Sequence, residues 1–152
     1  MFEHTLSDEA LLLETVQKMY ADTPVIVLGF SYGSFLTQHF IARHGEQLAG
    51  AVVAGSSYKK DAEVYLGSVV AALGSFFCGE KKPAKLIEKL SFGAYAKGFA
   101  GGAWLSTDDE NNKAYESDPF CGFTCSFRFY ADFFRGLRGL YTAKYAEKLR
   151  KD

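Results

Sequence analysis

The chain has 152 residues, of which 48% are apolar and 16% aromatic, enough for one packed domain or for part of one. Its 17 basic and 18 acidic side chains give a net charge of −1 without a block of like charge, which excludes a nucleic-acid-binding protein of the usual basic kind. The first residues, MFEHTLSDE, lack the basic flank and apolar core of a signal peptide, so we expect a cytoplasmic protein.

The first expected element is a helix that begins after Ser7. Ser7 is a residue type that caps helices, and two acidic residues follow it in the first turn. Apolar side chains then recur at three- and four-residue steps, which predicts an inward face made of Leu12, Val16, Met19 and Tyr20. The sequence Asp22-Thr23-Pro24 ends this helix.

A strand, a tight turn and a second helix follow. The apolar run 25–28 is typical of a buried parallel strand, and it leads directly into the pentapeptide GFSYG at 29–33. The next segment is amphipathic, with Phe35, Phe40 and Ile41 on its expected inward side, and Gly45 ends it. The apolar run 48–54 predicts a second strand, so residues 25–54 form one β-α-β unit.

The pentapeptide places a serine, Ser31, at the apex of the turn, with a glycine two positions to either side. Such a turn projects the serine Oγ above the sheet, and glycines at 29 and 33 remove Cβ atoms that would collide there. The start of the helix behind it offers N–H groups to a developing oxyanion. An ordinary strand-to-helix loop is the alternative, since composition alone gives this pattern in roughly one such chain in ten. A dinucleotide-binding turn is excluded because the required GxGxxG spacing is absent.

From residue 61 to residue 148 the sequence predicts helices without strands. The stretch 64–79 carries no charge; it is shorter than the roughly 20 residues that cross a bilayer, so a buried or substrate-facing helix is the better interpretation. Further helices are expected at 83–90, 109–117, 126–137 and 141–150. The aromatic residues of 126–137 fit either a core or the underside of a lid.

The three cysteines, Cys78, Cys121 and Cys125, are an odd number without a histidine near the last two. Buried reduced thiols are therefore expected rather than a zinc site or a disulfide. Lys81-Lys82 and the basic stretch 144–151 are interpreted as a solvated loop and a solvated helix face. No metal or cofactor is expected.

Four stretches together resemble one known family. They are GFSYGSF at 29–35, VAG at 53–55, WLSTD at 104–108 and the pattern YxxDPFCGF at 115–123. This combination is similar to the monoglyceride lipase/lysophospholipase branch of the α/β-hydrolases, often labelled serine aminopeptidase-like, and the last two motifs belong to the helical cap of that branch. The resemblance implies a partial α/β-hydrolase fold, with residues 1–58 in the core, 59–140 in a largely helical cap or lid, and 141–152 as a terminal helix returning toward the core.

The resemblance also implies a site and a substrate. Ser31 is the expected nucleophile and the backbone N–H of Tyr32 one oxyanion-hole donor, while Gly29 and Gly33 shape the turn. The expected substrate-binding side chains are Phe30, Trp104 and Phe120. The implied reaction is hydrolysis of a carboxylic ester of a lipid-like substrate, of the monoacylglycerol or lysophospholipid type, through an acyl-enzyme. The resemblance implies no cofactor. No transmembrane segment is expected, and any contact with a membrane surface would be made through the lid. Relatives commonly have His at the place of Phe30 and Met at the place of Tyr32, so these departures reshape the floor of the pocket.

The same resemblance implies missing parts. The acid and the histidine of such hydrolases follow the lid, and the second oxyanion donor precedes the first helix of this chain. His39 and His44 lie roughly 12 and 20 Å along the helix from Ser31 at 1.5 Å per residue, too far to serve as its base. His4 lies where the family places no base, and Asp108, Asp109 and Asp118 match cap positions.

We therefore expect the chain to be inactive alone, with open sheet edges and an open apolar sheet face. Two explanations are open: a truncated or split reading frame, or a chain that is completed by a second polypeptide. A non-catalytic fragment or pseudoenzyme whose lid binds lipid or a partner, and an acyltransferase or thioesterase on the same fold, remain as alternatives.

Overall fold

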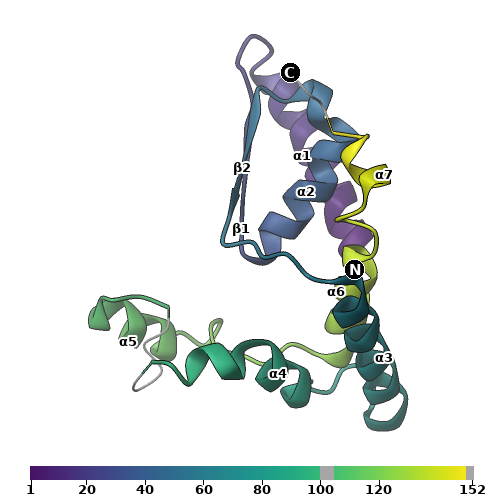
Figure 1. Ribbon diagram of the computed structural model, residues 1–152. Helices are drawn as coiled ribbons and strands as arrows, with labels where there is room; N and C mark the ends of the chain where they lie inside the picture. Colours follow the sequence, from purple (N-terminus) through teal and green to yellow (C-terminus); the bar gives the residue numbers. More distant parts are fainter. Residues whose placement is uncertain (100–104, 150–152) are drawn as a thin grey trace. The chain divides into compact units, whose positions relative to one another are not determined.

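The computed structural model describes residues 1–99 and 105–149 (Figure 1). The chain divides into two compact units, one formed by Met1–Leu66 with Asp132–Asp152 and the other by Gly67–Ala131. Each unit is described by itself. The boundaries expected from the sequence, after residues 58 and 140, stay a prediction.

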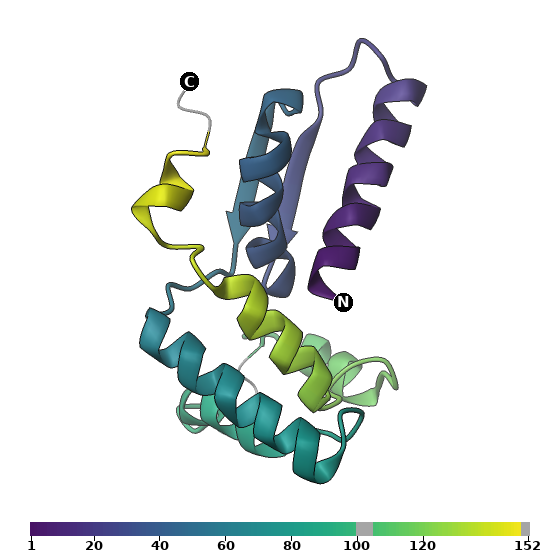
Figure 2. The same ribbon diagram turned by 90° about the vertical axis from the view of Figure 1, so that its right-hand side faces the viewer.

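The first unit contains the expected β-α-β arrangement. Strands β1 (Ile26–Phe30) and β2 (Gly50–Ala54) are parallel, with Ile26 opposite Gly50 and Phe30 opposite Ala54. Helix α2 (Tyr32–His44) connects them through a short 3-10 turn, Gly45–Gln47. Helices α1 (Phe2–Met19) and α2 lie against the same face of this two-stranded sheet (Figures 1 and 2).

Helix α1 packs through a different stripe from the one expected. The helix begins at Phe2, so Ser7 does not cap it; the Ser7 hydroxyl instead donates to the Glu3 carbonyl oxygen at 3.0 Å. The helix starts six residues earlier than expected, and its buried residues are Phe2, Leu6 and Leu13. Leu12, Met19 and Tyr20 are exposed, and only Val16 of the expected set is even half-buried. The predicted buried face was therefore wrong: the observed face is displaced by about one residue along the sequence.

Two groups of buried apolar side chains hold the first unit together. The first joins α1, α2 and the segment that precedes β2, and consists of Phe2, Leu6, Leu13, Leu36, Phe40 and Leu48. The second consists of Phe35, Val64, Leu137 and Leu140. Phe133 contacts both groups, with its ring 5.2 Å from that of Phe35 and 5.5 Å from that of Tyr32. These contacts place the end of the aromatic helix α6 (Phe127–Leu137) in a core.

The opposite face of the sheet is apolar and open. Alternation along β1 places Ile26, Leu28 and Phe30 on this face, where they are 64%, 67% and 69% exposed. Val52 of β2 lies beside Leu28 and is also exposed. Within residues 1–99 and 105–149, β1 and β2 pair only with each other, so both sheet edges are open as well. The expectation of an open apolar face and open edges is confirmed for the described residues.

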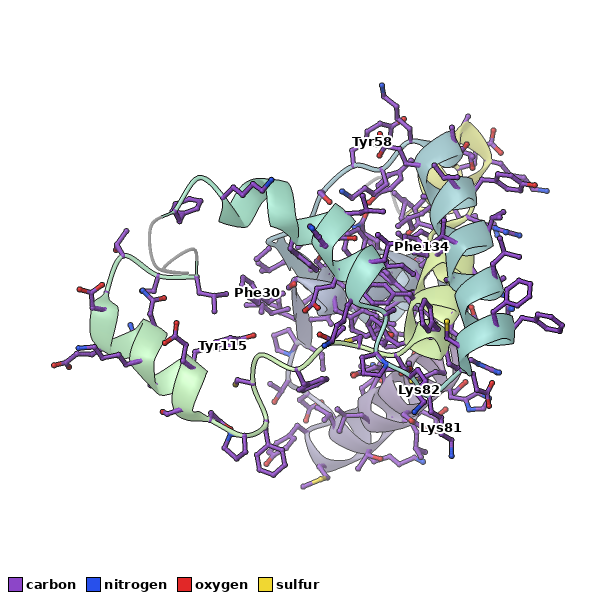
Figure 3. The ribbon with its side chains drawn as sticks, turned by 90° about the horizontal axis from the view of Figure 1, so that it is seen from below. Phe30, Tyr58, Lys81, Lys82, Tyr115 and Phe134 are labelled. Carbon is purple, nitrogen blue, oxygen red and sulfur yellow. The ribbon has the colours of Figure 1, made fainter. Side chains whose placement is uncertain are left out.

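The second unit is helical. Its described elements are the latter part of α3 (Asp61–Cys78), α4 (Lys85–Ala96), α5 (Asp109–Ser117) and the start of α6. The loop after α3 carries Lys81 and Lys82 (Figure 3), and it is joined to the start of α6 by an antiparallel bridge between Pro83 and Ser126. An ion pair between Glu80 and Arg128, at 3.1 Å, supports the same junction.

Three expectations about this part and the C-terminus are corrected. Helix α3 is mostly exposed rather than buried, and its uncharged outer side ends in Phe76 and Phe77. By length and composition it is long and apolar enough to cross a membrane. The terminal helix expected at 141–150 is reduced to one turn, α7 (Ala143–Ala146). Of the cysteines, Cys78 is exposed and the other two are half-buried.

Candidate functional site

Ser31 lies in the turn between β1 and α2, and its backbone is in an unusual conformation. Its φ of 51° and ψ of −117° lie outside the regions that side-chain-bearing residues normally adopt. Among the described residues it is the one non-glycine residue with positive φ. Such a conformation costs of order 1–3 kcal/mol and persists only where the surroundings enforce it, which is typical of functional turns.

Hydrogen bonds from both sides fix this turn. The Ser31 N–H donates to the Ala54 carbonyl oxygen at the end of β2, at 3.0 Å. The Ser31 carbonyl oxygen accepts from the backbone N–H of Ser34 at 2.9 Å and from its hydroxyl at 2.5 Å. Ser34 is fully buried, so its hydroxyl has no competing water. Sequence reasoning missed Ser34; the signal was a small hydroxyl residue in the first turn of the helix, three positions after the serine.

The two glycines of the turn have different roles. A Cβ on Gly29 would lie 2.7 Å from the Gly33 carbonyl carbon, and closer still to the Thr37 hydroxyl and the Gly33 carbonyl oxygen. Gly29 is therefore required for the close approach of β1 and α2. A Cβ on Gly33 would meet nothing within 4 Å. The expectation that both glycines remove a collision holds for Gly29 and is wrong for Gly33 within this structure.

The Ser31 side chain is exposed and is not used to cap the helix. Ser31 occupies the N-cap position of α2, yet its hydroxyl makes no capping hydrogen bond. Helix α2 begins at Tyr32, whose ring packs inward, 6.1 Å from Phe2. The backbone N–H of Tyr32 thus belongs to the positive end of a 13-residue helix, immediately after the serine. This arrangement can stabilise an anion that develops near the Ser31 Oγ.

His39 is the histidine nearest to Ser31 along α2, and its ring is engaged in contacts with other residues. Its Nε2–H donates to the Gly136 carbonyl oxygen at 2.6 Å. The ring packs edge-on against Phe2, at 5.4 Å, and against Tyr145, at 5.8 Å. Burial is the main cause that lowers the pKa of His39, and the neighbouring Arg43 cation lowers it further. His39 is therefore a neutral packing residue.

The other two histidines are also away from Ser31. His44 contacts Gln47 through Nδ1, at 3.3 Å, and stacks on Phe40 with ring centroids 4.7 Å apart. His4 is exposed on α1. None of the three histidines of the chain, all of which the structure describes, is hydrogen-bonded to the Ser31 hydroxyl.

Of the acidic residues considered from the sequence, Asp108 and Asp118 have structural roles. Asp108 caps α5 by accepting from the Glu110 N–H at 2.9 Å. Asp118 accepts from the Phe120 N–H at 2.8 Å. In the first unit, Asp132 is buried and pairs with the N-terminal ammonium group at 3.3 Å. These contacts give each carboxylate a local partner.

The expected substrate-binding side chains belong to different parts of the chain. Phe30 lies on the open face of the sheet in the first unit. Phe120 lies in the second unit and is 84% exposed, on the segment that follows α5 and its Tyr115 (Figure 3). Trp104 falls outside the described residues. Their role in binding stays a prediction.

A family model described as serine aminopeptidase, S33, matches residues 1–149. The chain belongs to the serine aminopeptidase S33 family. Among solved structures, this S33 chain is similar to a highly thermostable carboxyl esterase from Bacillus coagulans in complex with glycerol, with a TM-score of 0.77 and 22% identity. No curated protein matches the chain.

The match to the esterase covers 95% of this S33 chain and 48% of the esterase. The chain therefore spans about half the length of that solved relative. At this identity the likeness shows the fold, and with the family it establishes a partial α/β-hydrolase fold built on a parallel two-stranded sheet. The expectation of that fold class is confirmed.

Proposed function

We propose that this S33 chain carries the nucleophile of a serine hydrolase that cleaves carboxylic esters of lipid-like substrates, of the monoacylglycerol or lysophospholipid type. The observation that carries the proposal is the backbone of Ser31, held at φ 51° between a parallel strand and the start of a helix. A serine in this position gains no packing or capping role that would explain the strain. An exposed nucleophile explains it.

The reaction has two steps. In the first, the Ser31 Oγ attacks the ester carbonyl carbon, a base takes the hydroxyl proton, and the alcohol leaves with that proton. In the second, a water molecule attacks the acyl-enzyme, and the acid is released as Ser31 regains its proton. The start of α2, including the Tyr32 N–H, supports the negative charge on the carbonyl oxygen in both steps.

The base and the acid come from polypeptide beyond this chain. A serine without a base is an ordinary alcohol and a poor nucleophile. His39 is committed to Gly136, and His4 and His44 lie on other surfaces, so the chain by itself is inactive in this proposal. The two open edges of the sheet and its apolar face around Leu28 offer the place where the completing polypeptide binds.

The lipid-like character of the substrate rests on the apolar surroundings. Phe30, next to Ser31 in sequence, presents its ring on the sheet face, and Phe120 is exposed on the segment expected to form the lid. Neither side chain offers a charge for a peptide terminus. Ester hydrolysis is therefore preferred here over removal of an amino-terminal residue.

Labelling with a fluorophosphonate probe, read by mass spectrometry, tests the proposal. Trypsin releases Ser31 on the peptide 19–43. We expect this peptide to carry the adduct in an extract of the source cells, where the completing polypeptide is present, and to remain unlabelled in the purified chain. Monoacylglycerol or lysophospholipid added before the probe should reduce the labelling in the extract. An amino-acyl amide of similar size is the control and should leave it unchanged.

A non-catalytic protein is the second candidate, and the engagement of His39 by Gly136 favours it. In that case the apolar surfaces bind lipid or a partner without turnover. Peptide 19–43 would then remain unlabelled in the extract as well as in the purified chain.

A further inference from the structure

A basic groove lies in the first unit, at the end of α2 remote from Ser31. Its volume is about 280 Å³, and its walls are the second half of α2 and the C-terminal segment from Arg138 to Lys148. This segment, which contains α7, lies beside α2 in both ribbon views (Figures 1 and 2). His39 and Arg43 are 8 and 12 residues after Ser31, roughly 12 and 18 Å along the helix axis at 1.5 Å per residue. The groove is therefore separate from the catalytic turn.

The charged side chains that line the groove are all basic. Arg43 comes from α2, and Arg138, Lys144 and Lys148 come from the C-terminal segment. Glu3 of α1 offsets one of these charges through a two-pronged ion pair with Arg43, at 2.8 and 3.0 Å. Lys144 and Lys148 add two further positive charges along a concave surface built by parts of the sequence about 100 residues apart. The sequence alone suggested an ordinary solvated helix face for the two lysines.

The polar groups at the base of the groove are already paired within the protein. The Thr142 hydroxyl donates to the Gly139 carbonyl oxygen at 2.8 Å, and the Tyr145 hydroxyl donates to the Gln38 carbonyl oxygen. His39 donates to Gly136. These three side chains are therefore engaged by internal hydrogen bonds, and the exposed lysines Lys144 and Lys148 provide the donors for a ligand.

We propose that this groove binds a phosphate group, either inorganic phosphate or the phosphate of a small monoester. A phosphate group carries about 1.5 to 2 negative charges at neutral pH and has at least three acceptor oxygens, which matches a groove lined by several cations better than a single carboxylate does. The volume corresponds to about nine water molecules at 30 Å³ each, which is room for a phosphate with a small alcohol attached. The site goes beyond the proposed hydrolase function and does not depend on it.

His39 reports on occupancy of the groove. Burial lowers its pKa, and the charges of Arg43 and Lys148 lower it further, whereas Glu3 and the hydrogen bond to Gly136 act in the opposite direction. The facing groups are Glu3 from α1, Arg43 from α2 and Arg138, Lys144, Tyr145 and Lys148 from the C-terminal segment. A bound dianion offsets the nearby cations and so favours the charged imidazole. Phosphate should therefore raise the pKa of His39.

The test is a titration of the full 152-residue chain with inorganic phosphate and with glycerol 1-phosphate at constant ionic strength, followed by NMR of the His39 ring. The groove variant is Lys144→Glu with Lys148→Glu. Its matched control is Lys81→Glu with Lys82→Glu, which makes the same charge change at exposed lysines of the other unit. We expect saturable shifts and a raised His39 pKa in the wild type and the control, and affinity at least tenfold weaker in the groove variant.

A flotation assay with vesicles containing phosphatidic acid distinguishes a free phosphate from a lipid headgroup. If the wild-type chain floats with the vesicles and the groove variant does not, the ligand is a lipid headgroup. If the wild-type chain binds phosphate but does not float, the ligand is a small molecule. Both outcomes support the site. The proposal is overturned if neither source shifts His39 saturably in the wild type, or if the two double variants bind phosphate equally. Circular dichroism checks that the groove variant is folded, and the wild-type His39 titration decides the matter if it is not.

Discussion

The backbone of Ser31 stores strain that a glycine would not. At φ 51° and ψ −117°, a Cβ atom is unfavourable whatever the rest of the side chain is. Replacing Ser31 by Gly should therefore raise the free energy of unfolding by about 1 kcal/mol. Ser31→Ala keeps the Cβ and should leave stability within about 0.5 kcal/mol of the wild type. Urea unfolding of the two variants measures the difference, and equal stabilities would show that the turn is relaxed.

The two glycines that flank Ser31 provide a second comparison. Gly29→Ala places a methyl group against the Gly33 carbonyl group and the Thr37 side chain, and should cost roughly 1–3 kcal/mol of unfolding free energy. Gly33→Ala adds a methyl group to open space inside a helix, where alanine is favoured by up to about 1 kcal/mol. The same substitution should thus have opposite signs at the two positions. A similar loss at both in chemical denaturation would contradict this assignment.

At the residue scale, the sequence predicted the turn but only part of its support. The pattern GxSxG between an apolar run and an amphipathic segment predicts the type of turn. The pattern does not tell which of the two glycines leaves no room for a Cβ atom. That depends on the positions of the Thr37 side chain and the Gly33 carbonyl group in α2. The double hydrogen bond from Ser34 was missed for the same reason.

His39 packs where helices α1, α2 and α6 contact one another. Because its imidazole is partly buried there, the stability of the fold depends on pH. Burial lowers the pKa of His39 below its ordinary value of 6.5, so the unfolded chain takes up the proton first as the pH falls. The contribution of His39 is therefore complete above pH 6.5 and is lost as the pH falls through the lowered pKa of the folded state.

The measurement is the free energy of unfolding between pH 7.5 and pH 5. His39→Gln should flatten the decline over this range, because glutamine does not titrate. His4→Gln, a matched change at an exposed position on α1, should keep the wild-type profile. The account of His39 fails if its replacement leaves the decline unchanged.

At the element scale, the local sequence pattern predicted the strands and most helices. It did not always predict which face of a helix is buried or how long the helix is. Helix α5 begins and ends where the sequence predicted, because Asp108 caps it. Helix α1 starts earlier because Phe2 and Leu6 pack against Phe40, a contact that no local rule contains. The outer side of α3 is exposed although its sequence is apolar, and hydropathy alone cannot distinguish these environments.

At the scale of the whole molecule, we expect the open apolar face of the sheet to promote association of the chain. Ile26 and Leu28 are exposed on a sheet with two unpaired edges, which is a template for association. Replacing both by Thr retains β propensity and should shift the chain toward monomer, with a change in unfolding free energy within about 0.5 kcal/mol. Val27→Thr faces the helices instead and should cost about 1 kcal/mol or more without changing association. Sedimentation velocity and urea unfolding give the two readings, and unchanged association of the double variant would argue against this face.

The chain spans about half the length of the solved esterase to which it is similar, and in our proposal the catalytic site is completed by another polypeptide. The sequence contains the turn at Ser31, and a local pattern is enough to recognise it. In the proposed reaction the base, the acid and the second oxyanion donor come from polypeptide beyond this chain, so local patterns in its sequence do not reveal them.

The most direct measurement is fluorophosphonate labelling of the purified 152-residue chain beside its Ser31→Ala variant, with folding monitored by circular dichroism. The account predicts a folded chain with no labelling above that of the variant, because no histidine is hydrogen-bonded to the Ser31 hydroxyl. Ser31-dependent labelling of the purified chain would contradict it, since a base would then have to come from within these 152 residues.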